Sequence, residues 1–252
     1  MRSLSFFNTC LVSILAAGLL TSTAAAVPNF DYFGPLTEAT FGGTGIPNTE
    51  VAVASQFVDG DVEVTVAMSA TQRFSNPALT NDGAGTYIAG NGSNFGGAGQ
   101  SAFEGALWNF NYFIRVEGFN GATPILADYQ FNLFYDFDPG TDTPISSLGV
   151  IDLTASILVG ATPAATLVED SQNLLFGFLA TDIPGFLTAP GGTFNPNAVG
   201  EYNFGIQVTR AGWTVNSVAM DVQVVPEPAT ALLFGLGLAG LSAGRRRRQQ
   251  LN

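Results

Sequence analysis

Alternation of apolar and polar residues is the dominant pattern between residues 27 and 225. The segment 61–69 reads DVEVTVAMS, so every second residue from Val62 to Met68 is apolar. A repeat of two places the apolar side chains on one face of a β-strand. We therefore expect strands with one buried face wherever this repeat occurs. Besides 61–69, it marks residues 108–117, 129–137, 201–208 and 218–224.

Turn residues and aromatic rows indicate how some of these strands connect. Asp59-Gly60 separates residues 51–58 from 61–69 and predicts a two-residue hairpin turn. The segments 108–117 and 129–137 both carry aromatic residues at alternate positions. We expect these two strands to form a hairpin that buries a double row of aromatic side chains.

Less regular segments complete this part of the chain. Apolar runs at 148–153 and 174–179 predict two further strands. Residues 73–101 are rich in glycine and asparagine and predict a long loop with a short strand at 86–89. A second loop is expected at 182–197, where glycine and proline are frequent.

These patterns predict one all-β domain over residues 27–225. No stretch in it shows the 3.6-residue repeat of an amphipathic helix. About eight strands with one apolar face each favour an antiparallel, jelly-roll-like β-sandwich, with a closed β-barrel as the alternative. A chain of this length is sufficient to enclose a full hydrophobic core.

The first 26 residues have the three parts of a signal peptide. Arg2 supplies a positive start, residues 6–20 are mostly apolar, and small residues follow. Ala24 and Ala26 fit the small-residue positions that signal peptidase requires, which predicts cleavage before Val27. The alternative is a retained membrane helix, which the short apolar run disfavours.

The C-terminal end, residues 226–252, has a different composition. Pro226, Glu227 and Pro228 precede residues 229–244, which carry no charge. A helix over 229–244 would span about 24 Å, slightly less than a hydrocarbon core of about 30 Å. Flanking arginines can reach the headgroups, so we expect a transmembrane helix with its basic end in the cytoplasm. This basic cluster consists of Arg245, Arg246, Arg247 and Arg248.

This tail resembles the PEP-CTERM sorting signal of Gram-negative bacteria, and the resemblance covers residues 225–248 only. It implies that exosortase, a membrane enzyme, recognises and processes the Pro226–Pro228 motif. It also implies a cell-surface, outer-membrane or matrix protein in a host that makes exopolysaccharide. The prolines predict an extended strip just outside the membrane, which fits an enzyme cleft. An anchor that is never cut is the alternative.

Composition excludes several classes of function. The chain has 20 acidic and 8 basic residues, and 19 of the acids lie between Val27 and Val225 beside only three arginines. Such a negative domain is unsuited to nucleic acid. After removal of residues 1–26, which contain Cys10, no cysteine, histidine or lysine remains. Zinc fingers, thiol nucleophiles, haem ligands and Ser-His-Asp triads are therefore excluded.

Two segments of the domain are candidate binding sites. Asp136, Asp138 and Asp142 surround a Pro-Gly turn, which predicts a calcium site, although an acidic turn without a ligand has the same sequence. Amide side chains on the polar face of the expected aromatic hairpin, beside Phe113 and Phe134, predict a carbohydrate site. These amides belong to Asn109, Asn111, Gln130 and Asn132.

Catalysis would have to depend on carboxylates alone. A glycosidase needs two, and Asp136, Asp138, Glu117 and Glu201 are the candidates, but their spacing does not predict convergence. We therefore expect an exported, non-catalytic surface or matrix protein. A calcium-assisted carbohydrate-binding module is the alternative, and a carboxylate-pair glycosidase is a third.

Overall fold

The computed structural model describes residues 28–74, 78–97, 100, 102–155 and 164–226. These residues form strands joined by turns and three short 3-10 helices, η1 (Leu126–Asp128), η2 (Ile145–Ser147) and η3 (Gly177–Ala180). The strands are β1 (Tyr32–Gly34), β2 (Val51–Val58), β3 (Val62–Gln72), β4 (Thr80–Asn81), β5 (Thr86–Gly90), β6 (Ser93–Phe95), β7 (Glu104–Ala106), β8 (Trp108–Gly118), β9 (Gln130–Tyr135), β10 (Gly149–Asp152), β11 (Leu167–Gln172), β12 (Leu187–Thr188), β13 (Gly200–Arg210) and β14 (Trp213–Val225).

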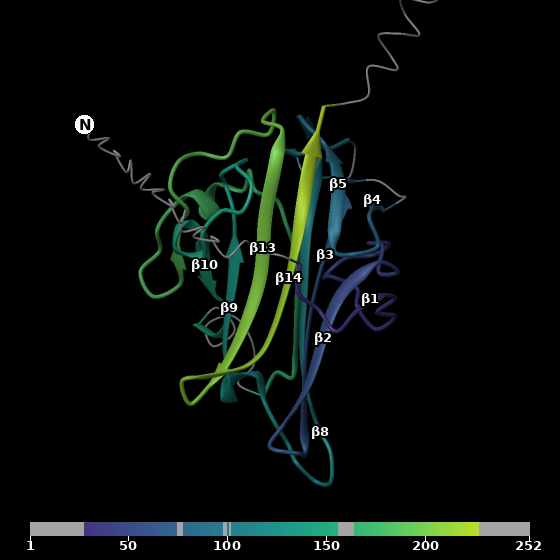
Figure 1. Cartoon of the computed structure of the whole chain (residues 1–252), viewed down its shortest axis with the longest axis vertical. Coiled ribbons are helices and arrows are strands. Elements are labelled where there is room, and N and C mark those ends of the chain that lie inside the picture. Colours follow the sequence, from purple (N-terminus) through teal and green to yellow (C-terminus); the bar gives the residue numbers. More distant parts are fainter. Residues whose placement is uncertain (1–27, 75–77, 98–99, 101, 156–163, 227–252) are drawn as a thin grey trace, which may run out of the picture.

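Two large sheets contain most of the strands. One has five strands in the order β1-β2-β3-β8-β11, and the other has seven in the order β12-β10-β9-β13-β14-β5-β4. Strands β6 and β7 form a small separate hairpin. Figure 1 shows β9, β13 and β14 side by side along the long axis of the molecule.

The two sheets pack face to face through their aromatic rows. The Trp108 ring of β8 lies 5.9 Å from the ring centres of Tyr202 and Phe204 on β13. Phe110 of β8 stacks on Phe204 at 4.8 Å. Because these rings come from different sheets and are all buried, the main core is the space between the sheets. The arrangement agrees with the predicted sandwich.

The hairpin predicted at Asp59-Gly60 is present, but its loop has three residues, Asp59 to Asp61, and not the predicted two, because Val58 pairs with Val62. Strands β2 and β3 pair antiparallel around this turn, and both turn residues have positive φ, 56° at Asp59 and 80° at Gly60. Aspartate and glycine are among the residues that adopt positive φ most readily, which fits them to this loop. The short strand expected at 86–89 is also present, as β5.

The predicted aromatic hairpin is wrong. Strand β8 pairs with β3 and β11, whereas β9 pairs with β13 and β10 in the other sheet. The two aromatic rows therefore face the same core from opposite sides. Alternation determines which face of a strand is buried but does not choose its partner.

Three further expectations need correction, and one strand was not predicted. Residues 174–179 form no strand, and the last three of them belong to η3. Strand β11 was not expected, because LVEDSQ has no apolar alternation. The pair β5–β14 is parallel, so the seven-stranded sheet is mixed and departs from an antiparallel jelly roll. Neither strand order closes on itself among the described strands, which excludes the closed barrel for this part of the chain.

A second, smaller core lies on the outer face of the five-stranded sheet. Residues 36–48, here called the strap, cover that face with Phe41, which is fully buried. The Glu169 carboxylate of β11 accepts hydrogen bonds from the backbone N–H groups of Thr40 and Phe41 at 2.8 and 2.7 Å. This second core consists of Leu36, Ala39, Phe41, Val51, Val53, Ala67 and Phe113.

Both predicted terminal segments lie outside the described residues. These are the signal peptide 1–26, with Ala24, Ala26 and the cleavage position before Val27, and the helix 229–244. Among the residues that the structure describes, none forms a helix long and apolar enough to span a membrane.

Candidate functional site

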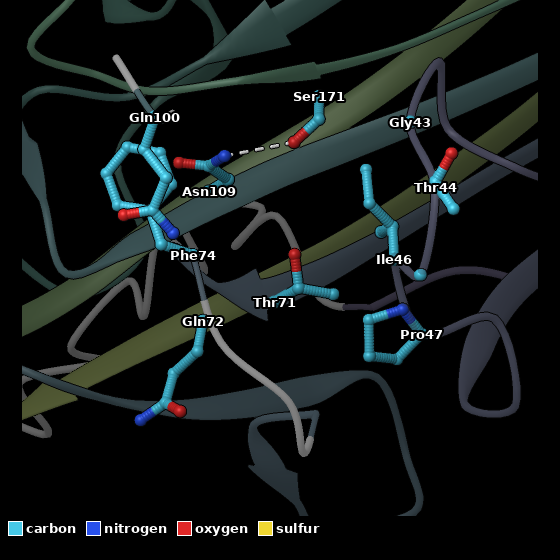
Figure 2. Close-up of a pocket in the computed structure, with 11 residues that line it drawn as sticks. Gly43, Thr44, Ile46, Pro47, Thr71, Gln72, Phe74, Gln100, Asn109 and Ser171 are labelled. Carbon is cyan, nitrogen blue, oxygen red and sulfur yellow. Dashed lines mark hydrogen bonds between the residues drawn. The ribbon is translucent and has the colours of Figure 1, made fainter. Parts of the chain in front are cut away.

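A polar groove opens beside the strap, over the outer face of the five-stranded sheet (Figure 2). It encloses about 450 Å³, which is within the usual range for ligand sites. The strap forms one wall, and residues from β3, β8 and β11 form the floor. We call it the strap groove. Its lining residues are Gly43, Thr44, Gly45, Ile46, Pro47, Thr71, Gln72, Phe74, Gln100, Asn109 and Ser171.

The Asn109 amide is fixed at both of its ends. Its Nδ2 donates to Ser171 Oγ at 3.0 Å, the contact drawn in Figure 2. Its Oδ1 accepts from Asn173 Nδ2 at 2.7 Å. Asn173 is fully buried and also donates to the backbone carbonyl of Trp108. The amide therefore has one orientation before any ligand arrives, which lowers the entropy cost of binding.

The Thr71 hydroxyl is positioned by a buried neighbour. Asn111, which is fully buried, donates from Nδ2 to Ser69 Oγ at 3.0 Å and to Thr71 Oγ1 at 3.1 Å. Its Oδ1 is buried without a hydrogen-bond partner among the described residues. Asn111 therefore supports the floor of the groove from below and is not itself accessible to a ligand.

An aromatic ring completes the groove at the end of β3. Phe74 is 39% exposed and has a φ of 61°, a left-handed conformation that a side chain with a Cβ rarely adopts. The guanidinium of Arg73 lies 4.3 Å from the ring centre and donates to the carbonyls of Asn94 and Phe103. Because Arg73 is 5% exposed, it fixes the β6–β7 hairpin and the ring, and it is not a surface cation.

The predicted carbohydrate residues do not form one surface. Asn109 and Asn111 lie on β8 of the five-stranded sheet, whereas Gln130 and Asn132 lie on β9 of the other. Gln130 Nε2 donates to Asn132 Oδ1 at 3.3 Å on the outer face of that sheet. Only Asn109 lines the strap groove. The cause is the wrong hairpin prediction, which placed β8 and β9 in one sheet.

Sequence reasoning missed most of the strap groove. Thr71 falls in the polar row of β3, which an alternation pattern can identify. Ser171 lies on the strand that had no recognisable pattern. The strap has no regular structure along most of its length, so no periodic signal places it against the sheet.

All residues of the predicted calcium turn lie within the described part of the chain. Asp136 is 1% exposed, and its Oδ1 accepts from the Asp138 N–H at 2.8 Å. Asp138 Oδ1 accepts from the Gly140 N–H at 2.9 Å, while Asp142 has a φ of 59°. No group of three acidic side chains among the described residues has the geometry to hold a metal ion. Calcium binding at Asp136, Asp138 and Asp142 stays a prediction.

Carboxylates do gather on the outer face of the seven-stranded sheet. Asn203 Nδ2 donates to Asp221 Oδ1 at 2.8 Å and to Glu201 Oε1 at 3.2 Å. Asp221 is 6% exposed, and burial, with added repulsion from Glu201, Asp142 and Asp82, raises its pKa to about 7. Burial likewise raises the pKa of the Asp136 carboxyl.

The four carboxylates considered for catalysis are distributed over both sheets. Glu117 lies on β8 and contacts Arg115, with Nη2 to Oε2 at 3.3 Å. Glu201 lies on β13, on the outer face of the other sheet, and Asp136 and Asp138 follow β9. Glu117 is thus separated from the other three by the sandwich.

The tail begins where the sandwich ends. Pro226 is exposed and directly follows β14, which ends at Val225. In Figure 1 the chain leaves the domain at this end, opposite the end that holds the β2–β3 and β13–β14 turns. Glu227, Pro228 and the cluster Arg245–Arg248 lie outside the described residues.

Residues 224–248 match the family model of the PEP-CTERM protein-sorting motif. The match confirms the resemblance that the tail sequence indicated, and it is confined to the tail. No curated protein and no solved structure matches the chain.

The PEP-CTERM motif supports a specific route for this protein. It indicates an exported chain that passes a membrane and is processed at the cell envelope by an exosortase-type system. The match begins at Val224, the penultimate residue of β14. The match thus includes the last two residues of β14, and the strap groove lies entirely outside it.

Proposed function

We propose that this chain is an exported, non-catalytic surface or matrix protein that retains extracellular polysaccharide in the strap groove. The PEP-CTERM match supports its delivery to the cell envelope. Signal peptidase would release residues 1–26, and exosortase would process the tail at Pro226, Glu227 and Pro228. The protein would then remain at the cell surface, in the outer membrane or in the matrix of an exopolysaccharide-producing bacterium.

The observation that carries the binding role is the fixed polar floor of the groove beside an exposed aromatic ring. Buried Asn173 and Asn111 hold the Asn109 amide and the Thr71 hydroxyl in place, and Asn109 in turn bonds to the Ser171 hydroxyl. Phe74 presents an apolar ring at the same groove. Sugar hydroxyls bond to such amides, and the CH faces of sugars pack on aromatic rings, so the combination suits a glycan.

A non-catalytic role is the simplest one that this arrangement supports. The groove residues include no acid, base or nucleophile with an activating partner. The carboxylates that a glycosidase would require lie elsewhere and are divided between the two sheets. Calcium assistance remains a separate prediction, which the experiment below also tests.

The test is retention of the processed protein, purified from the host culture, on the host's extracellular polysaccharide. We expect retention in calcium and in chelator alike, with no release of reducing sugar. Retention that is lost in chelator would shift the site to the Asp136, Asp138 and Asp142 turn. Absence of retention in both conditions would contradict the binding role and leave a protein defined by its sorting signal.

A further inference from the structure

We infer that the strap groove selects neutral polysaccharides and rejects acidic ones. This inference rests on the proposed function and adds the chemical class of the ligand. Three properties of the groove support it, namely its charge, its hydrogen-bonding groups and its apolar wall.

The groove supplies no positive charge to an anionic ligand. None of its lining residues within the described part of the chain is ionisable. The nearest arginine along the chain, Arg73, is buried and already donates to the carbonyls of Asn94 and Phe103. Binding of a uronate or sulfate would desolvate a charge without a counter-ion, which is strongly unfavourable.

The surroundings add repulsion. Glu169 and Asp170 precede Ser171 directly on β11, and the domain as a whole has 19 acids and three arginines. A polyanion approaching this surface would meet a negative potential at every ionic strength at which charges are not fully screened. A neutral chain carries no net charge for this potential to repel.

The hydrogen-bonding groups that remain are neutral and fixed. Ser171 Oγ accepts from Asn109, and Thr71 Oγ1 accepts from Asn111, so each hydroxyl keeps its own proton to donate. Asn109 Nδ2 has a second proton beyond the one that Ser171 accepts. Neutral donors of this kind match the hydroxyl and ring oxygens of an uncharged sugar.

The apolar wall suits the same ligand. Ile46 and Pro47 of the strap and Phe74 line the groove together with the polar floor (Figure 2). A sugar ring has one face of CH groups and an edge of hydroxyls, so it can contact both at once.

The experiment uses the processed protein and two probes, the neutral and the acidic fractions of the host polysaccharide separated on an anion exchanger. We expect the neutral fraction to be retained, with an affinity that changes less than about twofold between low and high salt because no ion pair forms. We expect no retention of the acidic fraction. Equal or stronger retention of the acidic fraction would overturn the inference while the proposed function stands, and retention of neither would overturn both.

A matched pair of variants assigns the binding to this groove. Asn109→Asp keeps the side-chain shape and the Oδ1 that accepts from Asn173, but it places a carboxylate in the groove. We expect it to weaken neutral-glycan binding about tenfold, equivalent to about 1.4 kcal/mol. Asn132→Asp makes the same change in chemistry and charge on the other sheet and should leave binding within about twofold. Equal effects of the two variants would show that the groove is not the site.

Discussion

At the residue scale, buried polar side chains determine much of this molecule's behaviour. Asn173 illustrates the point, since its amide bonds to the N–H and C=O of Ala106 and to the Trp108 carbonyl. It thereby satisfies backbone groups at the end of β7 and the start of β8 that would otherwise be buried without partners. The same side chain orients Asn109 in the strap groove, so one residue serves both the fold and the candidate site.

Asp221 predicts an unusual dependence of stability on pH. Its folded-state pKa of about 7 lies above the ordinary value of 3.8, so the folded chain retains a proton that the unfolded chain has lost. The free energy of unfolding should therefore decrease as pH rises from about 4 to about 7, and this contribution should then stay constant. Carboxylates that are paired in the folded state have the opposite effect, because folding lowers their pKa and the free energy of unfolding then increases as pH rises.

The Asp221→Asn variant tests this dependence. Asparagine keeps an Oδ1 that can accept from Asn203 but cannot ionise, so the penalty disappears. We expect stabilisation on the order of 2–4 kcal/mol at pH 8 and little change at pH 4, measured by chemical denaturation across this range. Asp61→Asn, an exposed turn residue bonded to Asn120, is the control. Identical pH profiles for the two variants would contradict the assignment.

At the element scale, one side chain of a neighbouring strand bonds the strap to the sheet, beside the apolar packing of Phe41. Glu169 accepts from two successive backbone N–H groups and from the Thr40 hydroxyl. Phe41 has a positive φ of 49° and is fully buried, so this part of the strap has little freedom once the carboxylate is in place. The strap in turn provides the apolar wall of the groove.

Removal of this carboxylate should loosen the strap more than the sandwich. For Glu169→Ala we expect a loss of about 2 kcal/mol, because hydrogen bonds to a charged acceptor are lost. Hydrogen exchange at the amides of Thr40 and Phe41 should accelerate, while exchange in β13 and β14 should not change beyond that global loss. Glu38→Gln alters only an exposed contact with Arg115 at 3.5 Å and should change stability by less than about 1 kcal/mol. Unchanged exchange in the strap would show that Glu169 does not hold it.

Some strands and turns could be predicted from the sequence and others could not, because only some of them depend on signals within a few residues. The presence of the β2–β3 hairpin follows from Asp59-Gly60, because a turn signal acts within a few residues, although the three-residue loop was not predicted. The pairings of β8 with β3 and of β9 with β13 join segments that are separated by long stretches of chain, so no local signal specifies them. Strand β11 has no apolar alternation because it is an edge strand whose side chains include Glu169 and Asp170.

At the scale of the whole molecule, the sorting signal and the candidate site are separate parts of the chain. The PEP-CTERM match begins at the end of β14, while the strap groove is built from β3, β8, β11 and the strap. A change in one part should therefore leave the other intact.

Because the two parts are separate, the sorting motif can be changed and tested without altering the strap groove. Glu227→Ala should leave the tail with Arg245–Arg248 uncut, because the motif that exosortase is expected to recognise is lost. Mass spectrometry of the protein from the envelope and the medium would measure this, with Glu201→Gln in the folded domain as a control. The uncut protein should still bind polysaccharide as the parent does. Normal processing of Glu227→Ala would contradict a role for this residue in sorting.

The sequence alone determined the features that depend on short stretches of chain. These are the strand-rich character of residues 28–226, the hairpin at Asp59-Gly60 and the sorting signal at 224–248. Each is encoded by a repeat of two, a turn dipeptide or a contiguous motif. Such signals do not depend on where the rest of the chain lies.

The tertiary structure decided everything that requires distant segments to meet. It placed β8 and β9 in opposite sheets, which separated Asn109 from Gln130 and Asn132. It laid the strap over the five-stranded sheet and brought Ile46, Thr71 and Ser171 to one groove. Pairing between distant strands is chosen by the packing of the whole core, because each apolar face can be buried against several partners, and only the complete fold satisfies all of them at once.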